Sequence, residues 1–200
     1  VLDAVAARPN LCAYFDIPVQ HSADRILKQM GRHYSTDALT AMMARIRQIV
    51  PQAAIRTTLI VGFPGETEAD FAHLLAFVQE ARFDHLGVFT YSDADDLASH
   101  GLPDPVDAQT AQARRDELMA VQRRLSEEAL RRYIDQEIEV LVEEHPEEGV
   151  FIGRAAFQAP EVDGLTYIHV ADHRTPVEIG RFVRVKITDT LEYDLVGAPV

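Results

Sequence analysis

The sequence predicts an α/β portion with parallel strands, followed by a small all-β barrel of the OB type. Between residues 11 and 91, strand-like apolar runs alternate with helical stretches in the order strand, helix, helix, strand, helix, strand. Strands separated by helices indicate a parallel sheet with right-handed crossovers. From Ile134 onward the pattern changes to five short strand-like runs bounded by Gly, Pro or Asp, which is typical of a closed or partly closed barrel.

The elements of the α/β portion follow from the spacing of apolar residues and from capping residues. We expect strands at 11–19, 55–61 and 86–91 and helices at 24–30, 36–50 and 68–82. Ser35 and Thr67 stand where helix N-caps belong, and Gly31 follows the first of these helices. The second strand ends at GFPG, residues 62–65, where glycine and proline favour a tight turn into the next helix.

Three parallel strands are few for a sheet that stands alone, because both faces and both edges would need cover. We therefore expect the α/β portion to be a piece of something larger. A long amphipathic helix should run from residue 107 to about 132, with its charged residues, Arg114 among them, on a solvated face. These boundaries divide the chain into an α/β portion at 1–106, a connecting helix at 107–133 and a barrel at 134–200.

The formal charge of −13 is unevenly distributed. Residues 134–200 hold 14 acidic against 5 basic side chains, a net charge of −9, whereas residues 1–133 hold 18 against 14, a net charge of −4. A field of this sign repels phosphate backbones and attracts basic partners, so we expect no direct binding of nucleic acid. Simple solubility is an equally good explanation of the acidic surface.

No apolar stretch is long enough to span a bilayer, and VLDAVAARPN at the start lacks the regions of a secretory signal, so we expect no membrane partner. The single cysteine, Cys12, cannot form an internal disulfide, which fits a reducing cytoplasm. Because Cys12 lies in an apolar run, we expect it to be a packed core residue and not a nucleophile.

Several common functional motifs are absent from the sequence. It contains neither the GxxxxGK[ST] of a phosphate loop nor the GxGxxG of a dinucleotide site. His169 and His173 are four residues apart but have no third ligand nearby, so we expect surface histidines and no metal site. No catalytic residue is assigned, because the order of Ser, His and Asp residues alone does not establish a triad.

Polar residues gather instead at the carboxyl ends of the three expected strands. In parallel α/β sheets and barrels, ligands bind at these ends. Because the three ends would face one mouth, the sequence predicts a ligand site there, formed by Gln20 and His21, residues 62–66, and residues 91–93.

Four stretches resemble a known family: DIPVQH (16–21), DRILKQMGR (24–32), RTTLIVGFPGETEADF (56–71) and FDHLGVFTYSD (83–93). They are similar to the second half of the radical S-adenosylmethionine (SAM) domain of methylthiotransferases, and residues 134–200 resemble the TRAM domain of that family. The implied fold is the α/β half of a partial, TIM-like radical SAM barrel followed by an OB-like TRAM barrel. APEVDG (159–164) and EYDLVG (192–197) resemble the RimO branch, which modifies an aspartate of small-subunit ribosomal protein twelve.

The resemblance also implies site residues. Those expected to bind SAM are Gln20, Gly62, Glu66, Tyr91 and Ser92. Arg32 could pair with a carboxylate of cofactor or substrate, or form a surface salt bridge. The family usually has Gly-Thr after Tyr-Ser, whereas this chain has YSDADDLASHG, so the conformation of that loop is left open.

Family chemistry requires two 4Fe-4S clusters, one of them held by a CxxxCxxC triplet, and thiolates are the required ligands. With a single cysteine, this chain lacks the cluster ligands and is expected to be a fragment without turnover. The parent enzyme would add a methylthio group to the aspartate β-carbon. The alternatives are a fragment of the sister branch, which modifies tRNA adenosines, and a non-enzymatic acidic adaptor that binds a basic protein through its barrel. The −9 charge disfavours the tRNA branch.

Overall fold

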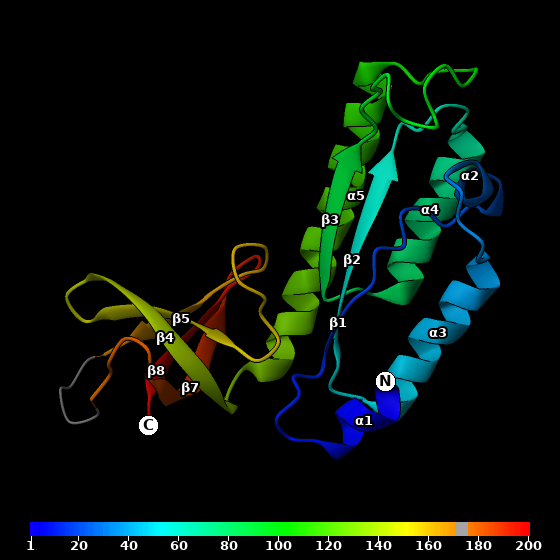
Figure 1. Ribbon diagram of the computed structural model, residues 1–200. Helices are drawn as coiled ribbons and strands as arrows, with labels where there is room; N and C mark the ends of the chain where they lie inside the picture. The colour runs from blue at the N-terminus through cyan, green and yellow to red at the C-terminus, as the bar shows by residue number, and fades with distance from the viewer. Residues whose placement is uncertain (171–175) are drawn as a thin grey trace. The chain divides into compact units, whose positions relative to one another are not determined.

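The computed structural model describes residues 1–170 and 176–200, and they form two compact units. The first unit comprises Val1–Pro9 and Phe15–Gln122, and the second comprises Asn10–Tyr14 and Arg123–Val200. His173, one of the two histidines considered above, lies outside the described residues. Figure 1 shows the elements of both units.

The first unit is built on a three-stranded sheet in the order β1-β2-β3. Its strands are β1 (Tyr14–Asp16), β2 (Ala54–Val61) and β3 (His85–Thr90), and its helices are α1 (Leu2–Ala7), α2 (Asp24–Gln29), α3 (Thr36–Ile49), α4 (Glu68–Ala81) and the start of α5 (Ala108–Leu130). Strands β2 and β3 pair in parallel from Arg56–His85 to Val61–Thr90, as the alternation of strands and helices predicts.

One face of this sheet is buried beneath helices, and the other is open. Alternate residues of β2 are fully buried, Ile55 and Leu59 among them, whereas Arg56 and Ile60 between them are only partly buried. On β3, Phe89 is 59% exposed. Figure 1 shows α4 and α5 on the same side of β2 and β3. The sheet therefore buries only one of its faces within the described residues.

Capping explains where the helices begin. Ser35 accepts a hydrogen bond from the Ala38 N–H at the start of α3. At α4, the Thr67 side chain accepts from the Asp70 N–H while the Asp70 carboxylate accepts from the Thr67 N–H, a complete capping box. Both caps confirm the predicted helix starts.

The first strand differs from the sequence prediction. It spans only Tyr14–Asp16 instead of residues 11–19, and Cys12 is exposed, so the expectation of a packed core cysteine is wrong. Among the described residues, strand β1 lies at the sheet edge with a partner strand on one side, and Pro18 lacks the N–H needed to extend the ladder. An apolar composition alone does not distinguish a buried strand from an extended segment.

The second unit is a closed barrel in the order β4-β5-β6-β8-β7, which confirms the predicted OB-like architecture. A short 3₁₀ helix, η1 (Arg131–Tyr133), precedes β4 (Glu137–Glu147), β5 (Val150–Ala155), β6 (Thr166–His169), β7 (Phe182–Thr190) and β8 (Leu195–Pro199). Its core contains Val140, Val142, Ile168, Val185, Ile187 and Leu195, each at most 1% exposed. The apolar side chains that alternate along these strands in the sequence therefore point into one closed core.

Candidate functional site

The carboxyl ends of the strands meet at one mouth of the first unit. Gln20 is held beside β2, because its N–H donates to the Thr58 carbonyl and its carbonyl accepts from the Ile60 N–H, both at 2.8 Å. Its φ of 69° places a non-glycine residue in the left-handed region. Such a conformation costs free energy and is enriched at functional sites. The backbone at Gln20 is thus fixed in a strained position.

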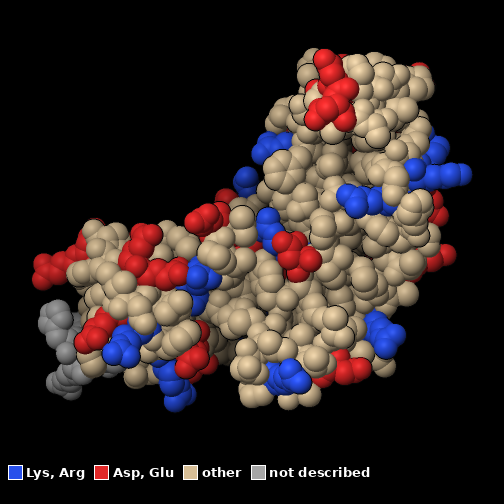
Figure 2. All heavy atoms as spheres, in the orientation of Figure 1, with Lys and Arg blue, Asp and Glu red and all other residues tan. Residues whose placement is uncertain are grey.

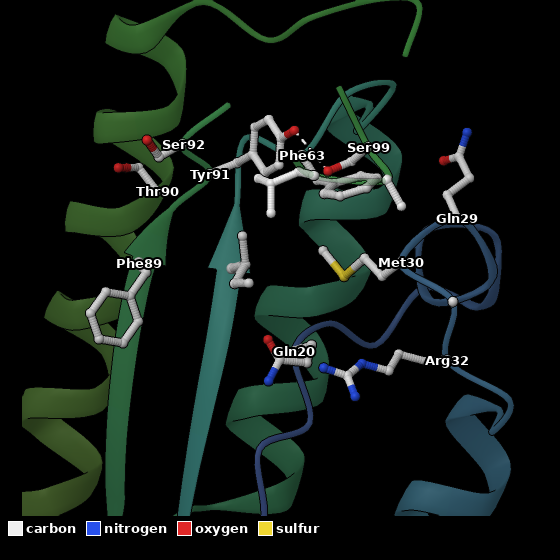
Figure 3. A pocket seen from close by; sticks show the side chains of 14 residues that line it. Gln20, Gln29, Met30, Arg32, Phe63, Phe89, Thr90, Tyr91, Ser92 and Ser99 are labelled. Carbon is white, nitrogen blue, oxygen red and sulfur yellow. Dashed lines mark hydrogen bonds between the residues drawn. The ribbon is translucent and has the colours of Figure 1, made fainter. Parts of the chain in front are cut away.

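A pocket of about 460 Å³ opens beside Gln20. Of the residues that the family resemblance implies as SAM ligands, Gln20, Tyr91 and Ser92 line this pocket. Its wall also includes Arg32 and apolar side chains: Met30, Ile60, Phe63, Phe89 and Leu97. In Figure 3 the guanidinium of Arg32 extends toward Gln20, whereas the side chains of Thr90 and Ser92 point away from these two residues.

Tyr91 stands at the centre of the mouth and fixes the loop that follows β3. Its hydroxyl donates to Asp93 Oδ1 at 3.0 Å and lies 2.9 Å from the Ser99 hydroxyl (Figure 3). Its ring packs edge-on against Phe63, with centroids 5.1 Å apart. His100 Nδ1 lies 3.0 Å from the other Asp93 oxygen. The loop whose sequence departs from the family pattern therefore folds back over Tyr91.

A second pocket of about 510 Å³ adjoins the first and shares Thr90, Tyr91 and Ser99 with it. Gly62 lines this second pocket and not the first. Its φ is 75°, and a Cβ built on it would lie 2.5 Å from the Ala111 Cβ on α5. Glycine is therefore required here both for the turn and for the close approach of α5.

Glu66 lines neither pocket. Its side chain is fully buried, and its carboxylate accepts a hydrogen bond from the Gly62 N–H. It also faces His21 Nε2 at 3.5 Å and Arg114 Nη1 at 3.3 Å. The structure thus brings Gln20, Tyr91 and Ser92 to one pocket, Gly62 to the neighbouring pocket, and Glu66 beneath the mouth.

Sequence reasoning missed the partners of Glu66. Arg114 was expected on a solvated helix face, but it is only 5% exposed and also pairs with Glu68 and lies over the Phe71 ring at 5.5 Å. The expectation is wrong because helical periodicity shows which residues share a helix face, but it does not show how much of that face other segments bury. Arg114 lies next to the apolar stripe residue Ala111 in helical position, at i+3, which could have indicated burial.

The chain matches two family models, one for each unit. Residues 1–78 match the Radical SAM superfamily, and residues 134–200 match the TRAM domain. The chain combines a radical SAM segment with a TRAM domain. The radical SAM match includes Gln20, Arg32 and Phe63 of the first pocket, and residues 89–99 of its wall lie beyond the matched range. The TRAM match covers the closed barrel.

Curated relatives extend this similarity across both the radical SAM segment and the TRAM domain. The ribosomal protein uS12 methylthiotransferase RimO of Desulfosudis oleivorans is 46% identical over 197 residues, and the proteins of the same name from Clostridioides difficile and Parasynechococcus marenigrum are 42% and 44% identical. Each comparison covers 98% of this chain but only 43–44% of the relative. The resemblance read from the sequence is confirmed, and the chain spans less than half the length of these relatives.

No group of three or more His, Cys, Asp or Glu side chains in residues 1–170 and 176–200 is arranged to hold a metal ion. Within the same residues, no helix has the length and apolar character needed to cross a membrane.

Proposed function

We propose that this chain is part of a radical SAM methylthiotransferase that adds a methylthio group to the β-carbon of an aspartate in ribosomal protein uS12. The observation that carries the proposal is the 46% identity to a RimO protein over 98% of the chain, which includes both units. The three relatives above are all named for uS12, which does not favour the tRNA alternative. We retain the division into 1–106, the connecting helix 107–133 and the TRAM domain 134–200.

The pocket beside Gln20 suits SAM chemically. The adenine ring needs an apolar wall, which Phe63, Met30 and Ile60 offer. The methionine carboxylate needs a cation, which Arg32 offers, and the ribose hydroxyls need a polar partner, which the Gln20 amide offers. A pocket of about 460 Å³ lies in the size range of small-molecule sites.

In radical SAM enzymes, bound SAM supplies the chemistry of hydrogen abstraction. The residues of this chain would orient the molecule. Gln20, with its backbone fixed between Thr58 and Ile60, would hold a polar group of SAM in one position. Tyr91, held by Asp93 and Ser99, would close the pocket on the side of the second cavity. Ser92 would border the ligand from the end of β3, and Gly62 would do so from the neighbouring pocket. Glu66 would support Gly62 from beneath the mouth, because its carboxylate accepts a hydrogen bond from the Gly62 N–H.

The residues present do not fit a 4Fe-4S cluster. Such a cluster needs three or four thiolates, and this chain contains the single cysteine Cys12. We propose that the ligands of both clusters lie outside these 200 residues and that this chain alone has no turnover. No step of the reaction is therefore assigned to residues of this chain.

The TRAM domain would dock the protein substrate. Residues 134–200 have a net charge of −9, and ribosomal proteins are generally basic. Figure 2 shows acidic side chains spread over the visible face of this barrel with basic ones between them, and no continuous basic patch on that face. A cytoplasmic location fits this partner.

Binding experiments with this chain test the proposal. We expect saturable binding to purified uS12 and none to an anticodon stem-loop RNA, by fluorescence anisotropy at near-physiological salt. Replacing two exposed TRAM acids, E144Q/E148Q, should weaken uS12 binding roughly threefold, because the attraction between the docking domain and a basic partner falls with the negative charge of that domain. The matched control E80Q/E117Q removes two exposed acids from the other portion and should leave the affinity unchanged. Preferential binding to the RNA would overturn the assignment to uS12.

A further inference from the structure

Three charged or ionisable side chains from three different segments meet beneath the mouth of the first unit. They are His21 after β1, Glu66 in the turn between β2 and α4, and Arg114 on α5. The side chains of His21 and Glu66 are 0% exposed, and that of Arg114 is 6% exposed. Burial of an ionised carboxylate costs several kcal/mol unless it is paired, so the buried Glu66 carboxylate depends on the partners that surround it.

The two oxygens of the Glu66 carboxylate contact different groups. Oε2 accepts a hydrogen bond from the Gly62 N–H and lies 3.3 Å from Arg114 Nη1. Oε1 lies 3.5 Å from His21 Nε2, a close charge contact, and neither of these two atoms has a hydrogen-bond partner among the described residues. Arg114 Nη1 also donates to the Glu66 backbone carbonyl at 3.2 Å. The Glu66 carboxylate thus contacts both the segment after β1, through His21, and the turn after β2, through Gly62.

The hydrogen bonds of His21 determine which ring nitrogen carries the proton. The Ala23 N–H donates to Nδ1 at 2.9 Å, so Nδ1 is the acceptor. A neutral imidazole then carries its proton on Nε2, and this proton faces Glu66 Oε1. His21 is therefore locked between a backbone donor and a buried carboxylate.

The two backbone positions that Glu66 holds are both wall positions of the candidate site. His21 follows Gln20 directly, and Gln20 lines the first pocket with a strained φ of 69°. Gly62 lines the second pocket with a φ of 75°. We propose that Glu66 is a positioning residue, which sets Gln20 through His21 and sets Gly62 directly without touching the ligand. The expected effect of Glu66 on SAM affinity rests on the proposed function. The coupling by Glu66 of the two wall segments, Gln20–His21 and the turn at Gly62, does not rest on it.

A glutamine at position 66 would not reproduce this arrangement. A carboxylate accepts hydrogen bonds at both oxygens, whereas an amide accepts at one and donates at the other. In E66Q, the amide oxygen can serve either the Gly62 N–H or the His21 Nε2–H but not both. One wall segment must then shift, or the imidazole must change tautomer.

The first test uses the wild-type chain of 200 residues and needs no substitution. Two-dimensional ¹⁵N–¹H NMR of the histidine rings reads the tautomer of each imidazole. We expect His21, assigned by its loss in H21Q, to show protonated Nε2 and unprotonated Nδ1. A His21 ring with its proton on Nδ1, or a doubly protonated ring, would overturn the proposal.

The second test compares E66Q with E68Q. Glu68 also pairs with Arg114, but its side chain is 83% exposed and touches neither wall segment. E68Q is therefore the matched control, because it removes the same charge next to Arg114 without altering the contacts of Glu66. In E66Q we expect the amide signals of Gln20 and Gly62 and the ring signals of His21 to shift. SAM affinity should fall roughly tenfold, as expected for loss of one charge-assisted hydrogen bond. Titration calorimetry measures this affinity, with the protein concentration corrected for the folded fraction. E68Q should change none of these quantities.

The outcomes separate this inference from the proposed function. If the wild-type chain does not bind SAM but the His21, Gln20 and Gly62 signals shift in E66Q alone, the coupling stands and the SAM site is wrong. If E66Q lowers the melting temperature but leaves the His21 tautomer and SAM affinity unchanged, Glu66 is only structural and the inference is overturned. Equal shifts in E68Q would overturn it as well.

Discussion

Arg154 on β5 and Glu143 on β4 form a two-point ion pair across neighbouring strands of the TRAM domain. Arg154 Nε donates to Glu143 Oε2 at 2.7 Å, and Nη2 donates to Oε1 at 2.6 Å. Arg154 also donates from Nη1 to the Gln158 carbonyl at 3.0 Å. The guanidinium thereby joins two strands and the loop after β5, although the charge count of this domain shows only an excess of acids.

Removal of the Glu143 charge should weaken the barrel modestly. We expect E143Q to lower the free energy of unfolding by about 1 kcal/mol, less than for a fully buried pair because the two side chains are 18% and 33% exposed. Urea unfolding at pH 7 measures the change. The control E144Q removes a neighbouring exposed carboxylate and should change the stability by less than about 0.5 kcal/mol. Equal effects in the two variants would contradict a specific role for the pair.

The same pair should make the barrel sensitive to acid. Hydrogen bonds from Arg154 lower the pKa of Glu143 by more than partial burial raises it. Because the folded state favours the ionised carboxyl, this stabilisation is present above the ordinary pKa of glutamate and is lost as pH falls through the lowered value. The difference in melting temperature between wild type and E143Q should therefore be constant from neutral pH to about pH 5 and shrink below about pH 4. A difference that persists unchanged into strong acid would show that the pair is not its source.

Gly62 should tolerate no side chain. Alanine there would adopt a left-handed φ of 75°, and its Cβ would lie 2.5 Å from the Ala111 Cβ. We expect G62A to cost about 3 kcal/mol, from backbone strain and overpacking together. G31A isolates the backbone part, because Gly31 has a φ of 71° with nothing within 4 Å of a built Cβ, and it should cost about 1 kcal/mol. The double variant G62A/A111G should regain most of the difference, and if it does not, the close approach of α5 is not the cause.

The capping box of α4 gives a local prediction. T67A removes the acceptor for the Asp70 N–H and should lower the free energy of unfolding by about 1 kcal/mol. T40A, at an exposed interior position of α3, should be neutral or slightly stabilising because alanine is the better helix former. Thermal unfolding followed by circular dichroism distinguishes the two. A neutral T67A would mean that Asp70 and Arg25 hold the helix start without the threonine.

The sequence allowed a correct prediction of the features that depend on local pattern. Apolar spacing located β2, β3, α3 and α4 to within a few residues, and the capping residues Ser35 and Thr67 set the helix starts. The burial of Arg114 and the exposure of Cys12 could not be predicted, because both depend on which distant segments cover them. The same holds for the candidate site: strand ends indicated Gln20, Tyr91 and Ser92, but only tertiary packing separates a pocket wall from the buried carboxylate of Glu66.

Gln20 should show a trade between stability and ligand binding. Its φ of 69° is strained for glutamine and unstrained for glycine. Because the relief of strain exceeds the extra backbone entropy that glycine loses on folding, Q20G should raise the free energy of unfolding by roughly 0.5–1 kcal/mol. The same change removes the amide from the pocket and should weaken SAM binding at least about fivefold, the effect of one lost hydrogen bond.

Asp104 provides the control, since it has a φ of 58° and lines neither pocket, so D104G should gain stability without loss of SAM affinity. If Q20G instead destabilises the chain, the side chain of Gln20 contributes packing that outweighs its backbone strain. If it is stabilising but binds SAM as tightly as wild type, Gln20 is not a SAM ligand, and the strained backbone alone does not mark a binding residue here.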